Sequence, residues 1–319
     1  MALGEFDLIA KYFTRDVRRA ALGIGDDCAL LAPAPGMQLA VSSDMLVEGR
    51  HFLTTVAPER LGHKALAVNL SDLAACGAQP LGFTLALALP RADERFLEGF
   101  SRGLFALADA QGIELVGGDT TQGPLNICIT VMGEVPVGAA LLRSGARAGD
   151  ELYVSGTVGD ARLALEVFRG IASLDGADFE QVREVMERPQ PRIALGIALR
   201  GVASSAIDVS DGLLGDLGHI LQRSAVAAVV EVDAVPRSQV LAAQPLELQR
   251  ECTLAGGDDY ELLFTAPPAL ADRVQAAARA AGVAATRIGR IEAGRGLRLV
   301  DREGRAVEHR FGSFDHFHS

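Results

Sequence analysis

Segments with the helical period alternate along the chain with short apolar runs typical of strands. Apolar positions recur every three or four residues over 60–75 and again over 92–111, which predicts two amphipathic helices. Gly112, directly after the second segment, is a typical helix stop. Strands are predicted at 37–43, 83–89, 113–116, 126–135, 151–155, 206–209, 227–232 and 262–265. This alternation predicts an α/β (α+β) fold.

Glycine and proline residues between 136 and 150 interrupt the alternation. A fresh strand begins at Glu151, so we place a domain boundary in the interruption. Further helices are predicted from Asp160 onward and at 179–186, 191–200, 211–223 and 269–281, with a short β region after them. We therefore predict an N-terminal domain over 1–137, a linker at 138–150 and a C-terminal domain over 151–319.

Composition and charge exclude several classes of protein. Of the 319 residues, 49% are hydrophobic, which is enough to form cores and excludes a chain that is disordered throughout. Acidic residues outnumber basic ones 41 to 30, and the net charge of −11 argues against a general nucleic-acid binder. Lys11 and Lys64 are the only lysines, and neither stands in the Gly-Lys-Ser/Thr sequence of a phosphate-binding P-loop.

The cysteines and the apolar runs favour a cytoplasmic protein. Four widely spaced cysteines form no CxxC pair, which is typical of a reducing compartment. The first residues lack the basic and apolar regions of a signal peptide. No apolar run approaches the roughly 18 residues that a membrane span needs. We expect neither a membrane nor a nucleic-acid partner.

Short motifs that contain aspartate lie beside apolar runs, several of them where a predicted strand ends. In chain order they contain Asp27, Ser42-Ser43-Asp44, Asn69-Leu70-Ser71-Asp72, Gly117-Gly118-Asp119, Asp208-Val209-Ser210-Asp211 and Asp258-Asp259. Carboxylates and hydroxyls, without histidine or cysteine at metal spacing, favour Mg²⁺ or Ca²⁺ over zinc or copper. Taken singly, each motif is better explained by helix capping or turn chemistry. Six of them in one chain favour a shared metal site.

Asp72 supports the metal interpretation, because it falls inside a predicted helix on its apolar face. A buried carboxylate there is costly without a partner, such as a metal ion. A pocket lined by carboxylates repels phosphates unless cations intervene, and Mg²⁺ combines one or two carboxylates with substrate phosphates. The residues therefore predict a site for a polyphosphate nucleotide with several Mg²⁺ ions. Hydrolysis of a phosphate ester at a two-metal site fits the same residues.

Each of the other candidate residues has both a functional and a structural explanation. His51 follows the Ser-Ser-Asp motif and either contacts a substrate or is incidental. The loop 156–159 precedes a predicted helix and could bind an anion, but a tight strand–helix turn explains it better. Arg143 and Arg147, in the glycine-rich interruption, either clamp a phosphate or are solvated.

The order and spacing of the longer motifs resemble those of one known family. The segments that carry the similarity are 23–30, 64–75, 117–121, 207–212 and 256–262, and it extends from Gly4 to Phe317. On these residues the chain resembles the thiamine-monophosphate kinases. That family belongs to the superfamily of aminoimidazole ribonucleotide synthetase and selenophosphate synthetase.

The resemblance implies a reaction and an architecture. The γ-phosphoryl group of ATP would pass to thiamine monophosphate, giving thiamine diphosphate and ADP in thiamine diphosphate biosynthesis. The transfer would be direct and in line at a multi-Mg²⁺ aspartate cluster, with no side chain assigned as acid, base or nucleophile. An N-terminal ATP- and magnesium-binding domain would pair its mixed sheet in a homodimer. A C-terminal α/β sandwich would complete the active site.

The resemblance also implies site residues, position by position. Magnesium positions are Asp27, Ser42, Ser43, Asp44, Asp72, Asp119, Asp208 and Asp211; ATP positions are Gly118, Asp119, Arg143 and Ser210; thiamine monophosphate positions are His51, Asp258 and Phe314. Three residues depart from the family pattern. Ser43 replaces the common Thr, Asp258 the usual Glu, and Phe314 a Tyr or Trp, so the site for the acceptor differs most.

Two alternatives to this kinase stay open. One is a sister ATP-dependent enzyme, similar to aminoimidazole ribonucleotide synthetase; the other is a magnesium- and nucleotide-binding module without turnover. Lys11 has no neighbouring cysteine of the kind selenophosphate synthetase needs, and the end His-Phe-His-Ser lacks the cysteine of hydrogenase-maturation relatives. Nucleotide binding without product formation would favour the module.

Overall fold

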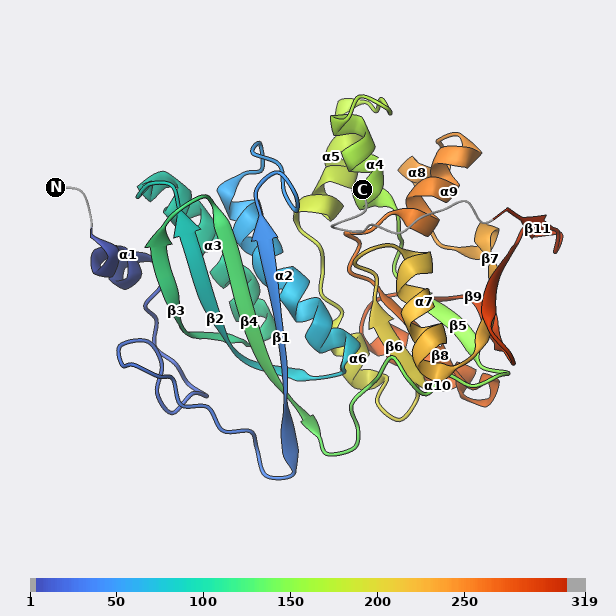
Figure 1. Cartoon of the computed structure of the whole chain (residues 1–319), viewed down its shortest axis with the longest axis horizontal. Coiled ribbons are helices and arrows are strands. Elements are labelled where there is room, and N and C mark those ends of the chain that lie inside the picture. The colour runs from blue at the N-terminus through green and yellow to red at the C-terminus, as the bar shows by residue number, and fades with distance from the viewer. Residues whose placement is uncertain (1–3, 309–319) are drawn as a thin grey trace. The chain divides into compact units, whose positions relative to one another are not determined.

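The computed structural model describes residues 4–308 and shows a mixed α/β fold in two compact units (Figure 1). Within the described residues, the first unit comprises residues 4–73 and 78–138, and the second comprises residues 74–77 and 139–308. Each unit contains one sheet with helices packed on it. The predicted α/β class is therefore confirmed.

The first unit is built on a four-stranded mixed sheet in the order β1-β4-β2-β3. Its strands are β1 (Met37–Val47), β2 (Gln79–Leu89), β3 (Glu114–Gln122) and β4 (Asn126–Pro136), and its helices are α1 (Glu5–Tyr12), α2 (Pro58–Ala75) and α3 (Glu94–Gln111). Strands β2 and β3 run parallel, whereas β4 pairs antiparallel with β1 and with β2. Helices α2 and α3 lie against one face of the sheet (Figure 1).

Alternating burial along β4 shows why the sheet has two unlike faces. Ile127, Ile129 and Val131 are fully buried, while the residues between them, Cys128 and Thr130, are half-buried. Side chains alternate between the faces of a strand, so the buried series packs on the helices. The side chains on the opposite face lie in a more exposed layer.

Both ends of α3 have capping groups. The Asp93 carboxylate accepts hydrogen bonds from the N–H groups of Arg95 and Phe96 at 3.1 and 3.2 Å. Gly112 ends the helix with φ 65°, in the left-handed region that favours glycine. The predicted stop at this residue is confirmed.

The second unit is built on a seven-stranded sheet in the order β11-β10-β7-β9-β5-β8-β6. The strands are β5 (Glu151–Ser155), β6 (Ser205–Asp208), β7 (Ala227–Glu231), β8 (Leu262–Ala266), β9 (Ala285–Glu292), β10 (Gly296–Val300) and β11 (Ala306–Val307). The helices are α4 (Asp160–Phe168), α5 (Gly176–Glu187), α6 (Ile193–Ala198), α7 (Leu213–Ser224), α8 (Gln239–Ala242), α9 (Leu246–Ala255) and α10 (Ala271–Ala280), with 3₁₀ turns at Val232–Ala234 and Pro268–Leu270. Among the strands described in this sheet, β10 and β7 pair in parallel and the other neighbours pair antiparallel.

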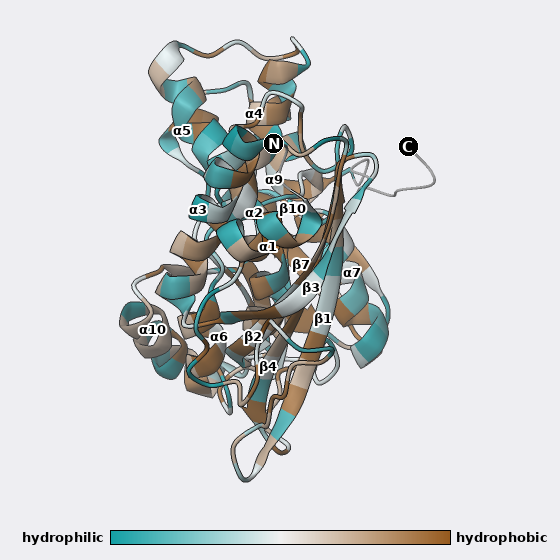
Figure 2. Ribbon diagram, turned by 90° about the vertical axis from the view of Figure 1, so that its left-hand side faces the viewer, coloured by the Kyte–Doolittle hydropathy of each residue, from teal (hydrophilic) through white to brown (hydrophobic). Residues whose placement is uncertain are grey.

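Helix α7 packs on this sheet through one apolar stripe. Leu213, Leu217 and Ile220 are fully buried, at the i, i+4, i+7 spacing of a single helix face. They join Val154 and Leu263, which are fully buried in neighbouring strands, in one core. Figure 2 shows helices that carry both hydrophilic and hydrophobic colours, as amphipathic helices do.

Two predicted element boundaries are wrong in ways that affect the site. Strand β1 continues to Val47, so Asp44 lies inside a strand and not at its end. Strand β3 runs from Glu114 to Gln122, so Gly118 and Asp119 lie inside a strand, whereas the predicted strand ends at residue 116. In both places pairing with a neighbouring strand extends the ladder through polar and glycine residues that favour turns in isolation. None of the helices described here is both long and apolar enough to span a membrane.

Candidate functional site

Strand β1 and helix α2 bring four of the polar motif residues together. The Ser42 hydroxyl donates a hydrogen bond to Oδ2 of Asp72 at 2.5 Å, and the Asp44 N–H donates to Oδ1 of Asn69 at 2.9 Å. The amide of Asn69 also donates to the carbonyl of Ala65 one turn earlier, at 3.0 Å. We call Ser42, Asp44, Asn69 and Asp72 the β1–α2 cluster.

Two periodicities explain why these residues meet. Ser42 and Asp44 are two residues apart in a strand and so point to the same face, while Asn69 and Asp72 are three apart on a helix. Asp72 is half-buried, and its Oδ2 accepts a hydrogen bond from the Ser42 hydroxyl, where the sequence predicted a partner such as a metal ion. Asn69 received no role from the sequence, although its place three residues before Asp72 indicates a shared face.

Ser43 belongs to the opposite face of the sheet. Its hydroxyl lies 2.9 Å from Oγ1 of Thr130 and donates to the carbonyl of Ile129 at 3.2 Å. The side chain is exposed, whereas Ser42 and Asp44 are half-buried against α2. The structure therefore separates the Ser43 hydroxyl from the β1–α2 cluster.

Gly118 and Asp119 lie on the far edge strand of the same sheet. Asp44 pairs with Ile129, Ile129 with Leu85, and Leu85 with Gly118, so one row of the sheet joins the two edges. Three strand spacings correspond to about 14 Å. Within this unit, a single metal ion could therefore not contact both Asp44 and Asp119.

Gly118 is a position that only glycine fits. Its φ is 148°, and a Cβ atom there would lie 1.9 Å from the carbonyl oxygen of Leu85. The glycine allows β3 to approach β2 closely at this row. Asp119 follows with an exposed side chain at the edge of the sheet.

Two further residues of the first unit lie in loops. Asp27 is exposed, and its N–H donates to Oδ1 of Asp26 at 2.9 Å. His51 lies in the turn after β1, where its Nδ1 accepts a hydrogen bond from the Val47 N–H at 2.9 Å. Because Nδ1 accepts, the neutral imidazole carries its proton on Nε2.

In the second unit, the turn between β6 and α7 carries Asp208, Ser210 and Asp211. A second turn, 257–261, packs directly on it: the Asp258 N–H donates to the carbonyl of Ser210 at 2.8 Å. The close approach requires glycine at position 257, where a Cβ atom would lie 2.2 Å from that same carbonyl oxygen. The structure thus brings the predicted ATP residue Ser210 next to the predicted acceptor residue Asp258.

Three buried carboxyl groups near these turns have raised pKa values. Burial and the neighbouring Asp211 carboxylate raise the pKa of Asp216 to about 7, while three backbone hydrogen bonds act in the opposite direction. Burial also raises the pKa of Asp160, and that of Asp259 well above its usual value. Asp160 and Asp216 did not stand out as functional in the sequence, because their burial depends on elements distant in the chain, whereas Asp259 belongs to the predicted Asp258-Asp259 motif.

Asp259 lies behind Asp258 and points into the core. Its Oδ2 accepts a hydrogen bond from the Gly159 N–H at 2.8 Å, and its Oδ1 has no hydrogen-bond partner in the described part of the chain. Asp258 itself adopts φ 72°, an uncommon value for a residue with a side chain. The backbone of this turn is therefore held in an unusual conformation by its packing.

The remaining two predicted residues are not joined to these groups. The Arg143 carbonyl accepts a hydrogen bond from Ser224, the last residue of α7, at 3.3 Å. Ser210 precedes the first turn of that helix, whose 12 residues span about 18 Å. Arg143 and Ser210 therefore lie near opposite ends of α7. Phe314 lies outside the described residues.

The donor set of the β1–α2 cluster fits magnesium better than a softer metal. Its side chains offer carboxylate, hydroxyl and amide oxygens, which are the atoms that Mg²⁺ prefers. Between residues 4 and 308, no three His, Cys, Asp or Glu side chains are grouped so as to hold a metal. That is compatible with Mg²⁺, which commonly takes one or two carboxylates and completes its shell with water and phosphate.

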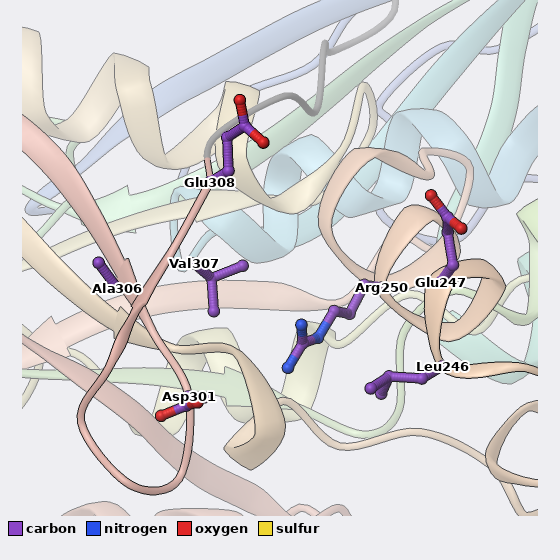
Figure 3. A pocket seen from close by; sticks show the side chains of 7 residues that line it. All are labelled: Leu246, Glu247, Arg250, Asp301, Ala306, Val307 and Glu308. Carbon is purple, nitrogen blue, oxygen red and sulfur yellow. The ribbon is translucent and has the colours of Figure 1, made fainter.

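A cavity of about 520 Å³ in the second unit contains none of the predicted site residues (Figure 3). It lies between α9 and β11 and is lined by Leu246, Glu247, Arg250, Asp301, Ala306, Val307 and Glu308. Both acidic and apolar side chains face it, with Arg250 as the single cation of the lining. Its residues do not belong to either candidate group described above.

Two known domain families match the chain in tandem. "AIR synthase related protein, N-terminal domain" matches residues 25–135, and "AIR synthase related protein, C-terminal domain" matches residues 147–302. This succession of two α/β domains is the arrangement of the AIR synthase related proteins.

Full-length relatives narrow this class. Thiamine-monophosphate kinase of Salmonella typhimurium is 47% identical over 324 residues, which cover 99% of each chain. The crystal structure of thiamine-monophosphate kinase from Stenotrophomonas maltophilia K279a has a TM-score of 0.85 at 47% identity, covering 94% of this chain and 95% of that one. AaThiL complexed with AMPPCP and TMP has a TM-score of 0.78 at 31% identity, covering 90% and 89%. The chain belongs to the thiamine-monophosphate kinase family.

Proposed function

We propose that this protein phosphorylates thiamine monophosphate with ATP, giving thiamine diphosphate and ADP. The observation that carries the proposal is the 47% identity to a thiamine-monophosphate kinase across 99% of both chains. A complex of the related AaThiL with AMPPCP and TMP supports the pair of substrates. The enzyme would act in thiamine diphosphate biosynthesis, in the cytoplasm.

Magnesium ions are proposed to bind the aspartates and serines of both units. The residues are Asp27, Ser42, Ser43, Asp44, Asp72 and Asp119 of the first unit and Asp208 and Asp211 of the second. Mg²⁺ bound there would neutralise the charge of the phosphates and the charge that develops during transfer. The best support is the β1–α2 cluster, where hard oxygen donors already face one another.

The chain's own residues would bind and orient the two substrates. Gly118, Asp119, Arg143 and Ser210 are proposed for ATP, and His51, Asp258 and Phe314 for thiamine monophosphate. The backbone hydrogen bond from Asp258 to Ser210 supports a short distance between the two sets in the second unit. His51 would present Nε2–H to the acceptor, since Nδ1 already accepts from the backbone.

The proposed transfer is direct and in line, and it needs no strong general base. A phosphate monoester is largely a dianion near neutral pH and is itself the nucleophile. The residues therefore contribute by positioning and by charge, and none is assigned as acid, base or covalent nucleophile.

A homodimer is proposed through the sheet of the first unit. Leu39, Val41 and Met45 alternate along β1 and leave 47%, 62% and 53% of their surface exposed. Apolar side chains in such a row are typical of an interface. Pairing of two sheets would also offer a route by which the edge with Asp119 meets a second copy's edge with Asp44. Light scattering should give twice the monomer mass for the unsubstituted protein and the monomer mass for Val41→Glu. The monomer mass for both proteins would contradict the dimer.

The experiment is product formation from thiamine monophosphate and ATP with Mg²⁺, and again with excess EDTA. Thiamine diphosphate and ADP should appear in equal amounts, and EDTA should stop the reaction. Asp44→Asn is the matched variant, because it keeps the backbone N–H that binds Asn69 and removes only the charge.

Three results would contradict the proposal. Product formation that persists in excess EDTA would show that the reaction does not need magnesium. Undiminished activity of Asp44→Asn would show that this carboxylate is not part of the site. Tight ATP binding without any thiamine diphosphate would favour a sister enzyme or a module without turnover.

A further inference from the structure

The carboxylate of Asp216 holds the turn that carries Ser210 and Asp211. Asp216 lies in the first turns of α7, with 2% of its surface exposed. A single oxygen, Oδ2, accepts hydrogen bonds from the N–H groups of Ser210, Asp211 and Gly212 at 3.0, 3.1 and 3.1 Å. The N–H groups of three successive residues, directly before α7, therefore point at one side chain of that helix.

Successive N–H groups that converge in this way form a concave site for an anion. In many nucleotide-binding proteins a phosphate occupies such a site at the start of a helix. Here the chain's own carboxylate fills it. Glycine is suited to the last position of this turn, because the φ of Gly212 is 124°, a value that residues with side chains rarely adopt. A phosphate of the nucleotide would have no access to these three donors.

The carbonyl groups of the same turn are also fixed by hydrogen bonds. The carbonyl of Ser210 accepts from the Asp258 N–H at 2.8 Å, and the carbonyl of Val209 accepts from the Tyr260 N–H at 2.9 Å. The peptide groups of the turn thus have their N–H groups fixed by Asp216 and their carbonyls fixed by turn 257–261. The side-chain oxygens of Ser210 and Asp211 take part in none of these backbone hydrogen bonds.

We propose that Asp216 is a positioning residue: by filling the anion site at the start of α7, it directs Ser210 and Asp211, rather than backbone amides, toward the magnesium-bound nucleotide. This inference rests on the proposed function, because it takes the nucleotide as the ligand of Ser210. It adds that the turn recognises its ligand through side chains. Asp216 itself touches neither substrate nor metal.

Asp216→Asn is the variant that tests the proposal. It preserves the size of the side chain but, above pH 7, replaces a charged acceptor of three hydrogen bonds by a weaker neutral one. The KM for ATP and the Mg²⁺ concentration for half-maximal rate should each rise about tenfold, while the KM for thiamine monophosphate stays within about twofold. The Kd of Mg²⁺–AMPPCP, measured by calorimetry without turnover, should rise by a similar factor.

Asp175→Asn is the matched control. Asp175 caps α5 of the same unit and accepts from the N–H groups of Ala177 and Asp178 at 3.0 and 2.9 Å. No proposed ligand contacts its loop, so this variant should leave both KM values and the magnesium dependence unchanged. A loss that both variants share would indicate a general effect on folding and would overturn the positioning role.

Hydrogen exchange of the unsubstituted protein provides a test that needs no variant. The amides of residues 210–212 should exchange as slowly as those inside α7, and Asp216→Asn should accelerate them. Fast exchange in the unsubstituted protein would overturn the inference even if Asp216→Asn failed to fold. Equal rises in both KM values would also overturn it. If the unsubstituted protein forms no thiamine diphosphate, the proposed function fails, while exchange and AMPPCP binding still decide the role of Asp216.

Discussion

The segments 69–72 and 208–211 share the pattern of an amide or acid, an apolar residue, Ser and Asp, yet they form different structures. The first lies within α2, so the helical period decides which residues face β1. The second leaves strand β6 at Asp208 and turns toward α7. Similar residues are therefore arranged in one case by local periodicity and in the other by contacts from outside the segment.

The two serines show what this difference means for function. Ser71 is completely buried, and the residues that meet β1 are Asn69 and Asp72 on either side of it. Ser210 is half-buried in a turn that Asp216 and turn 257–261 fix from two sides. In the helix, the first and last residues of the motif, Asn69 and Asp72, contact β1. In the turn, the consecutive residues Ser210 and Asp211 are the ones proposed to bind a ligand.

Loss of one carboxylate from either segment should have the largest effect. Asp72→Asn and Asp211→Asn are each expected to lower kcat at least about 100-fold, because each removes a charge from the proposed magnesium site. The two variants should differ in stability without metal. Asp72→Asn keeps an oxygen for the Ser42 hydroxyl, whereas Asp211→Asn removes repulsion with Asp216 and should raise Tm.

Steady-state rates at saturating substrates and melting curves in EDTA check this prediction. Asp233→Asn is a suitable control, since this aspartate pairs with Arg250 and has no role in the proposed site. Equal activity of Asp72→Asn and the unsubstituted protein would show that the motif in α2 is structural. A lower Tm for Asp211→Asn would contradict the repulsion.

Asp259 should make the stability of the folded protein depend on pH. Its pKa is raised by burial in the folded protein, so the folded state holds the proton at a pH where the unfolded state has lost it. The free energy of unfolding contributed by this group is complete below about pH 4 and falls, by at most about 1.4 kcal/mol per pH unit, as the pH rises toward the folded pKa.

Asp259→Asn should remove this part of the pH dependence, because the amide does not ionise. Urea unfolding between pH 4 and 8 measures it, and the variant should gain stability relative to the unsubstituted protein as the pH rises. Parallel curves for the two proteins would show that Asp259 is ionised throughout in the folded state.

Asn69 should matter for stability at a smaller scale. Asn69→Ala leaves the Asp44 N–H without its acceptor and is expected to lower the free energy of unfolding by about 1–3 kcal/mol. Asn126→Ala provides the comparison, since Asn126 begins β4 and is only half-buried. If urea unfolding shows equal losses for both, the bond to Asp44 adds nothing particular.

The two serines should give the smallest effects and separate the segments most clearly. Ser210→Ala should raise the KM for ATP about tenfold with little change in stability, as loss of a hydrogen bond to a charged ligand does. Ser71→Ala should lower the free energy of unfolding by about 1 kcal/mol and leave that KM unchanged. The same effect of both changes on the KM would mean that the two segments act alike.

Much of the fold could be predicted from the sequence, because local periodicity is strong in its long elements. The helix at 60–75 and the strand at 151–155 correspond to α2 and β5. The ends of β1 and β3 could not be predicted, since Ser42–Asp44 and Gly117–Asp119 favour turns unless a neighbouring strand pairs with them. The candidate site residues could be found from their chemistry and from the family resemblance. The sequence did not show that those of β1 and β3 lie at opposite edges of one sheet.

The sequence by itself determined the α/β class, the oxygen-rich donor set and the family, because these depend on residue types and their order. Tertiary structure decided which donors meet: Ser42 with Asp72, and Asp258 with Ser210. It also placed Asp44 and Gly118 at opposite edges of one sheet. The reason is physical: hydrogen bonds and strand pairings between residues far apart in the chain leave no local period that a sequence can display.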